Sequence, residues 1–190
     1  MSDRKLLNIE LGRISAEEYR SGRTPSGIVL VLDNVRSAHN TGSAFRTADA
    51  FGVDKVYLGG ITPVPPSPEL RKVALGAEEV VPSEHVSDVL DLVRRLKAEG
   101  YTVIAVEQTV HSVKLDEFQR EIAGPSTGPS TGSGTGASYA LVFGNEVAGV
   151  QQEVVDACDF ALEIPQKGTK HSLNVSVSIG VVLWAISVRG

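Results

Sequence analysis

Three short stretches of the chain place amides, hydroxyls, a carboxylate and a guanidinium beside small residues, directly after apolar runs. They are residues 33–46, 143–149 and 164–174. Side chains of these types can bind an oxygen-rich ligand through several hydrogen bonds at once. Parallel α/β sheets bind ligands outside the carboxyl ends of their strands, so polar stretches placed in this way indicate one site built from distant segments.

The first stretch leads from an apolar run into a helical pattern. Asn40 is well placed to cap this helix. Ala44, Ala48 and Phe51 fall on one stripe that should face the sheet, and Arg46 lies roughly 160–200° away from Ala44 and Ala48. Arg46 is therefore expected to project from the far face, with Asn40 near its base. A solvated surface arginine is the alternative interpretation.

The second and third stretches offer a turn and a helix start. Gly144 permits close approach of the backbone, and Glu146 follows at the end of an apolar run. The alternative is a glycine-bounded turn with a solvated glutamate. Ser172 is expected to cap a final helix, whose free amides can hold an oxygen-rich ligand, unless this is only a well-capped last helix.

Five continuous apolar runs are expected to be strands that position these stretches. The runs are residues 27–32, 55–58, 101–106, 139–143 and 160–164. Apolar runs of this length, bounded by turn residues, are typical of strands buried on both faces. Helical patterns lie between them, so the chain is predicted to be a single α/β domain with a mainly parallel sheet.

Two helices have clear boundaries in the sequence. Ser15 and Glu18 form a capping box that predicts a short helix through about Ser21. A second helix is predicted from apolar residues at helical spacing, with Gly100 as the stop signal. Its apolar residues are Val86, Val89, Leu90, Val93 and Leu96.

Composition excludes several classes of protein. The 190 residues include 18 basic and 23 acidic side chains, a net charge of −5, so any site for a polyanion must be a local patch. The single cysteine, Cys158, excludes an intramolecular disulfide and a cysteine-based metal cluster, which favours a reducing, cytoplasmic setting. The histidines lack metal-ligand spacing. They are His39, His85, His111 and His171.

The termini and the longest apolar run argue against export and membrane insertion. No signal peptide is expected, because the charged N-terminus leads into no long apolar run. The most apolar stretch, 179–186, is far shorter than the roughly 20 residues that a membrane-spanning helix needs. No dinucleotide-binding glycine motif follows the first strand, and no Gly-x-Ser-x-Gly stretch stands between a strand and a helix, as a hydrolase nucleophile elbow requires.

Residues 124–137 form a biased segment that repeats Gly-Pro-Ser-Thr. A phosphate-binding loop would follow a strand, open a helix and contain a lysine, whereas this segment precedes a strand and has none. We expect a flexible surface insertion. Because loop closure depends weakly on length, replacement by a short linker should cost about 1 kcal/mol or less.

Together the three stretches resemble the motifs of the SpoU/TrmH-type RNA 2′-O-ribose methyltransferases of the SPOUT superfamily. The matching motifs are Asn40-x-Gly42-x-x-x-Arg46-x-Ala48, Phe143-Gly144-Asn145-Glu146 with Gly149, and Ile164-Pro165 through Ser172-Leu173-Asn174-Val175-Ser176-Val177. The order and spacing of all three make the resemblance specific. It covers residues 27–190, preceded by a short N-terminal segment, 1–26, that contains the capped helix. Val147 stands where the family often has glycine.

This resemblance implies a parallel sheet of five or six strands, with the C-terminal segment threaded as a trefoil knot. It implies that S-adenosylmethionine binds bent in the knot and is held largely by the backbone. The implied cofactor-binding residues are Gly144, Asn145, Ile164, Gly168 and Leu173. It further implies a homodimer with the site near the subunit interface, and no metal. The additional RNA-binding domain that precedes the catalytic domain in many members is not expected.

The resemblance also implies roles in catalysis for five residues: Asn40, Arg46, Glu146, Ser172 and Asn174. A guanidinium keeps its proton, so Arg46 is expected to grip the ribose and its phosphate and to stabilise the developing alkoxide. The other four would orient Arg46 and the ribose, and Glu146 could pair with an arginine. Candidate phosphate-binding residues are Arg4, Lys5, Arg13, Arg20, Arg23, Arg36, Arg71, Lys72, Lys167 and Lys170.

The leading hypothesis is therefore S-adenosylmethionine-dependent 2′-O-methylation of tRNA or rRNA. A catalytically silent RNA-binding or assembly module on the same fold is the alternative, and the presence of all five residues disfavours it. A SPOUT enzyme that methylates a base nitrogen is a third hypothesis, disfavoured by Ser172-Leu173-Asn174.

Overall fold

The computed structural model describes residues 3–12, 14–122, 137–170 and 172–187. The insertion expected at 124–137 lies outside these residues except for Ala137, as do Arg13 and His171. The first described elements are a 3-10 helix, Asn8–Leu11, and α1, Ala16–Gly22. Helix α1 confirms the predicted capping box, because Ser15 Oγ accepts from Glu18 N and the Glu18 carboxylate accepts from Ser15 N.

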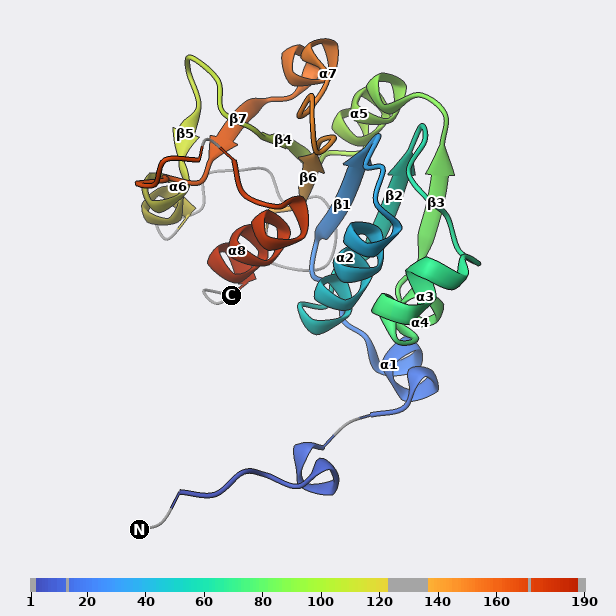
Figure 1. The fold of residues 1–190 in the computed structure, drawn as a ribbon. Helices are drawn as coiled ribbons and strands as arrows, with labels where there is room; N and C mark the ends of the chain where they lie inside the picture. The colour runs from blue at the N-terminus through green and yellow to red at the C-terminus, as the bar shows by residue number, and fades with distance from the viewer. Residues whose placement is uncertain (1–2, 13, 123–136, 171, 188–190) are drawn as a thin grey trace.

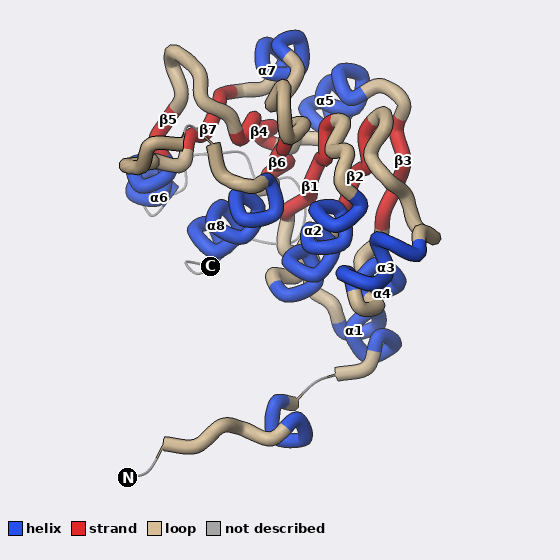
Figure 2. Tube along the Cα trace, viewed as in Figure 1, coloured by secondary structure: helices blue, strands red, loops and turns tan. Residues whose placement is uncertain are grey.

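Seven parallel strands form one sheet in the order β3-β2-β1-β6-β4-β7-β5. The strands are β1 Ile28–Asp33, β2 Lys55–Gly59, β3 Ser83–Val86, β4 Thr102–Val106, β5 Val113–Lys114, β6 Tyr139–Phe143 and β7 Phe160–Glu163. All five predicted strands are confirmed within a residue or so at each end. The α/β class with a parallel sheet is therefore confirmed, and the strands form a central layer between helices (Figure 1, Figure 2).

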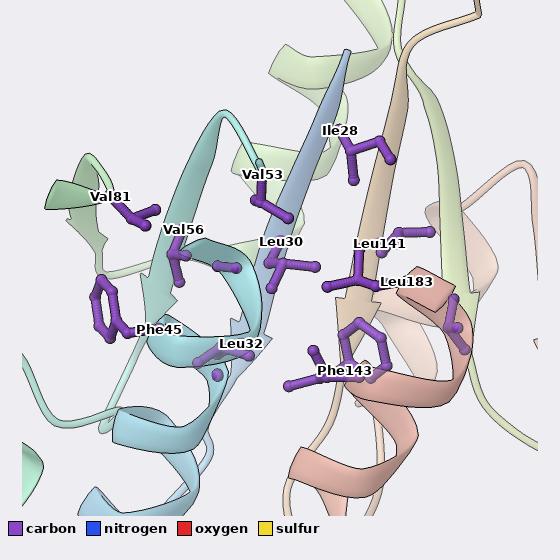
Figure 3. Packing of buried hydrophobic residues seen from close by; sticks show 14 of the residues in the cluster. Ile28, Leu30, Leu32, Phe45, Val53, Val56, Val81, Leu141, Phe143 and Leu183 are labelled. Atoms are coloured by element: carbon purple, nitrogen blue, oxygen red, sulfur yellow. The ribbon is translucent and has the colours of Figure 1, made fainter. Parts of the chain in front are cut away.

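Helices cover both faces of the sheet. They are α2 Ala38–Ala50, α3 Pro68–Ala74, α4 Ala77–Val80, α5 Val89–Ala98, α6 Leu115–Ile122, α7 Gln152–Ala157 and α8 Val175–Ser187. Side chains of β1 alternate between two buried clusters, as the period of two in a strand requires. Leu30 and Leu32 pack with α2, α3 and α8 on one face, where Figure 3 shows Phe143 and Leu183 close by. Val29 and Val31 pack with α5 and α7 on the other.

The expectation of five or six strands was wrong, because two short edge strands complete the sheet. Strand β3 alternates between exposed and half-buried residues, and β5 has two half-buried residues, so neither has a continuous apolar run. Val86, predicted to be helical, ends β3 instead, and α5 begins at Val89. The trefoil knot stays a prediction, since strand order and pairing do not define a knot.

Two predicted helix caps were also wrong. Ser37, not Asn40, caps α2, and its hydroxyl accepts from Asn40 N at 3.3 Å. Helix α8 begins at Val175, so Ser172 lies before its first turn. Asn174 takes the capping role, because its Oδ1 accepts from Ser176 N at 2.9 Å. The side chains of Asn40 and Ser172 therefore do not cap the helices that they were predicted to cap.

Two further features concern the helices and the single cysteine. Within the described residues, every helix is too short or too polar to cross a bilayer. Cys158 is buried, and its burial raises the pKa of the thiol to about 12, so it is not a nucleophile near neutral pH.

Candidate functional site

A cavity of about 490 Å³ opens at the carboxyl ends of β4, β6 and β7 and at the start of α8. This volume lies in the range of sites for small organic ligands. The lining residues are Val106–Gln108, Phe143–Gly149, Leu162–Ile164, Gln166, Ser172–Val175 and Ser178. The register explains the convergence, because Val106 pairs with Leu162 and Leu32 pairs with Phe143, which aligns the strand ends.

A chain of hydrogen bonds joins the three sequence motifs beside this cavity. Asn40 Nδ2 donates to Glu146 Oε1 at 2.9 Å, and Asn174 Nδ2 donates to Asn40 Oδ1 at 3.1 Å. Asn40 has its side chain free for both bonds because Ser37 caps α2. Residues more than 100 positions apart in the sequence are thereby held at fixed mutual positions.

Glu146 binds the amides that precede α2. Its Oε2 accepts from Arg36 N at 3.0 Å, and its Oε1 accepts from Ser37 N at 3.1 Å as well as from Asn40. Partial burial raises the pKa of Glu146, but the hydrogen bonds from Arg36 N, Asn40 and Ser37 N outweigh burial, and the net pKa lies below its ordinary value. Among the described residues, the partners of Glu146 are two backbone amides and the Asn40 side chain rather than an arginine side chain.

The turn from Gly144 to Val150 is compact and internally bonded. A Cβ atom on Gly144 would come within 2.0 Å of Gly149 C and Val150 N, so the close approach at Gly144 is to the chain's own backbone. Asn145 Oδ1 accepts from Val147 N and Ala148 N, and its Nδ2 donates to Asn34 O at 2.7 Å. The Asn145 side chain therefore shapes the turn. Val147, which stands where the family often has glycine, does not have a positive φ, so the turn accommodates a side chain at this position.

Two carboxylates that the sequence analysis did not single out fasten the end of this turn. Glu107 Oε2 accepts from Val150 N at 3.0 Å, and Asp33 Oδ2 accepts from Gln151 N at 3.0 Å. Asp33 is the last residue of β1, and Glu107 directly follows β4. The sequence signal that could have identified both residues is a carboxylate directly after an apolar run, since the three polar stretches begin at the same kind of position.

Three predicted site residues do not line the cavity: Asn40, which lies beside it, Arg46 and Gly168. Arg46 is exposed on α2, as its helical phase predicted, and within the described part of the chain its side chain makes no hydrogen bond or ion pair. It lies six residues beyond Asn40, about 9 Å along the helix axis. Gly168 is exposed in the loop before α8 and does not line the cavity. The remaining predicted cofactor residues, Gly144, Asn145, Ile164 and Leu173, do line it.

Seven of the ten candidate phosphate-binding residues fall into two groups. Arg4, Arg23 and Arg71 form ion pairs with Glu10, Asp54 and Glu79, respectively, and Arg23 is largely buried. Arg36, Lys72, Lys167 and Lys170 are exposed, as is Arg46, and none of them has an ion-pair partner among the described residues. Arg36 and Arg46 lie at α2, and Lys167 and Lys170 lie in the loop before α8, so positive charge adjoins the segments that carry Asn40 and Asn174.

The fold and the cavity define a parallel α/β protein with a ligand site at the carboxyl ends of its central strands. The SpoU rRNA Methylase family model matches residues 27–184. The chain belongs to this family.

Known proteins with related sequence or structure agree with this assignment. The chain is 31% identical over 173 residues to the 23S rRNA (guanosine-2′-O-)-methyltransferase RlmB of Pseudomonas putida, covering 91% of this chain and 63% of that protein. The crystal structure of the A. aeolicus TrmH/SpoU tRNA modifying enzyme superposes with a TM-score of 0.73 at 26% identity, covering 92% of this chain and 81% of that one. AdoMet-bound rRNA methyltransferase from Sinorhizobium meliloti gives a TM-score of 0.70 at 27% identity, covering 85% and 56%. The chain thus spans less than two thirds of the curated relative's length.

Proposed function

We propose that this protein transfers a methyl group from S-adenosylmethionine to a ribose 2′-hydroxyl of tRNA or rRNA. The observation that carries the proposal is the hydrogen-bond chain Glu146–Asn40–Asn174 at the edge of the cavity. The names of its relatives support the same reaction class. The proposal assigns residues 27–190 to the knotted catalytic domain and residues 1–26 to a short N-terminal segment, and it places the protein in the cytoplasm.

The cavity has the chemistry that S-adenosylmethionine requires. Val106, Ile164 and Leu173 supply apolar surface for a purine ring, and carboxylates among the lining residues supply acceptors for hydroxyl and ammonium groups. Within the described residues, no group of three or more histidine, cysteine or acidic side chains is placed to hold a metal ion. Gly144, Asn145, Ile164 and Leu173 would hold the cofactor, with Gly168 in the adjoining loop.

Bound S-adenosylmethionine supplies an electrophilic methyl group, and the protein must position the hydroxyl that attacks it. Holding the two reacting atoms about 3 Å apart in line accounts for much of the rate in such displacements. Arg46 keeps its proton near neutral pH, so its proposed role is to grip the ribose and adjacent phosphate and to stabilise the developing alkoxide. Asn40, Glu146, Ser172 and Asn174 would orient the ribose, and a phosphate oxygen or water would take the proton.

We further propose that the protein is a homodimer that pairs through α8. This helix is apolar almost all round, yet it exposes Val177, Val181 and Trp184 at helical spacing, with Leu173 in line before its first turn. Trp184 is 61% exposed, and a solvent-facing stripe of this kind is typical of an interface. Light scattering should show a dimer for the wild type and a monomer for Val177→Asp. A monomeric wild type at micromolar concentration would refute the proposal.

The function is tested by incubating the purified protein with labelled S-adenosylmethionine and with tRNA and rRNA transcripts. Mass spectrometry of the digested RNA should show a 2′-O-methylated nucleotide. Methyl groups on a base nitrogen instead would establish the third hypothesis. The protein could instead bind RNA without transferring a methyl group, both to transcripts and to RNA from cells that lack the protein. That result would establish the alternative of a catalytically silent binding module.

A further inference from the structure

Three carboxylates line the cavity, and two of them have their charge compensated locally. Glu163 forms an ion pair with Lys114 and also accepts a hydrogen bond from Ser112 Oγ. Glu146 binds the amides that precede α2, where the positive end of the helix dipole stabilises an anion. The third, Glu107, is different.

Glu107 carries a negative charge without a cationic partner among the described residues. Its Oε1 accepts from Gln108 N at 2.8 Å and its Oε2 from Val150 N at 3.0 Å, both of them neutral backbone donors. Each carboxylate oxygen has a second lone pair, so the group retains acceptor capacity toward the cavity that it lines. Glu107 is half-buried, which limits screening of its charge by solvent.

The neighbouring turn leaves space for this carboxylate. A Cβ atom on Gly149 would come within 2.2 Å of Glu107 Oε2, and Gly149 has a φ of +69°. A side chain at position 149 would therefore displace Glu107 as well as strain the turn. The glycine in the second motif thus keeps an uncompensated carboxylate at the cavity wall.

We propose that Glu107 is a specificity-determining residue that selects the cationic sulfonium form of the cofactor over its demethylated product. This inference rests on the proposed function. S-adenosylmethionine carries a positive charge on sulfur, which S-adenosylhomocysteine, a neutral thioether at that atom, lacks. An unpaired carboxylate in the wall attracts the first ligand more strongly than the second, so the product leaves more readily.

Calorimetry with each ligand alone tests this selection without any turnover. The wild type should bind S-adenosylmethionine on the order of tenfold more tightly than S-adenosylhomocysteine, a ratio that corresponds to about 1.4 kcal/mol. In Glu107→Gln the ratio should fall to about one, chiefly through weaker binding of S-adenosylmethionine. Glu107→Asp keeps the charge but shortens the side chain, so both ligands should bind less tightly while the preference persists.

Asp156→Asn is the matched control, because it removes one negative charge from an exposed position on α7 outside the cavity lining and should leave both affinities unchanged. A wild type that binds both ligands with equal affinity would overturn the inference. Glu107→Gln that weakens both ligands by the same factor would also overturn it, since a structural role or a bond to a group that both ligands share would give that result. Failure of the wild type to bind either ligand would instead refute the proposed function.

Discussion

Replacing Asn40 with alanine tests whether the hydrogen-bond chain organises the site. The substitution removes the bond to Glu146 at 2.9 Å and the bond from Asn174 at 3.1 Å. A hydrogen bond contributes about 0.5–1.5 kcal/mol, and more when one partner is charged. Solvent competes at these partly exposed groups, so we expect a loss of about 1–2 kcal/mol. For a domain of this size that corresponds to a decrease in Tm of about 2–8 °C.

The effect on methyl transfer should be much larger than the effect on stability. Without Asn40, the segments that carry Glu146 and Asn174 are no longer tied together, and a displacement of about 1 Å at a reacting centre costs on the order of 100-fold in rate. Binding of S-adenosylmethionine should change little, because Asn40 does not line the cavity. The measurements are thermal unfolding, calorimetry with the cofactor and single-turnover transfer to the RNA substrate.

Ser37→Ala is the matched control for this substitution. It removes the side-chain cap of α2, at a cost of about 1 kcal/mol, but leaves the bonds of Asn40 to Glu146 and Asn174 in place. Its Tm should therefore decrease to a similar extent while its transfer rate stays close to that of the wild type. Equal transfer rates for the two variants would refute the reasoning, because stability alone would then account for the behaviour of Asn40→Ala.

Arg46→Ala should leave Tm unchanged, since this exposed side chain has no partner among the described residues. The same substitution should slow methyl transfer by about 100-fold. Arg46→Lys should restore little of the rate if a bidentate grip is needed. Glu146 has a pKa below its ordinary value of 4.5, so its stabilisation is present above that pH and disappears as the pH falls through the folded-state pKa. Glu146→Gln should therefore lower Tm at pH 7, with the difference from the wild type shrinking as the pH falls below 4.5. Excess chelator should leave calorimetric binding of S-adenosylmethionine unchanged; lost binding would reveal a metal requirement.

The sequence predicted the buried parts of the fold far better than the edges. Continuous apolar runs located the five strands with both faces covered, because burial on two sides leaves an unmistakable composition. Strands β3 and β5 lie at the edges of the sheet, where one or both faces meet solvent. Polar residues such as Glu84 and Lys114 interrupt their apolar pattern, so the sequence does not indicate a strand there. Their existence depends on neighbouring strands, which local patterns do not encode.

The sequence motifs predicted where the cavity lies. The hydrogen-bond partners of the motif side chains could not be predicted, because they depend on the tertiary structure. The motif residues at positions 144, 146 and 174 line the cavity. Asn40 was expected as a helix cap, but Ser37 lies three residues earlier and competes for the same role. Glu107 was not predicted because a glutamate after a strand is usually solvated, and its hydrogen bond from Val150 N depends on the turn from Gly144 to Val150.

The position of α8 in the chain has a consequence for biosynthesis. The segment from Ser172 to Ser178 forms one wall of the cavity, and it emerges from the ribosome after every other segment that lines it. A nascent chain that still lacks this segment can form β1 and β6 but has an open binding surface. The cofactor is therefore expected to recognise only chains whose last helix has docked, and its binding energy then stabilises that finished state by mass action.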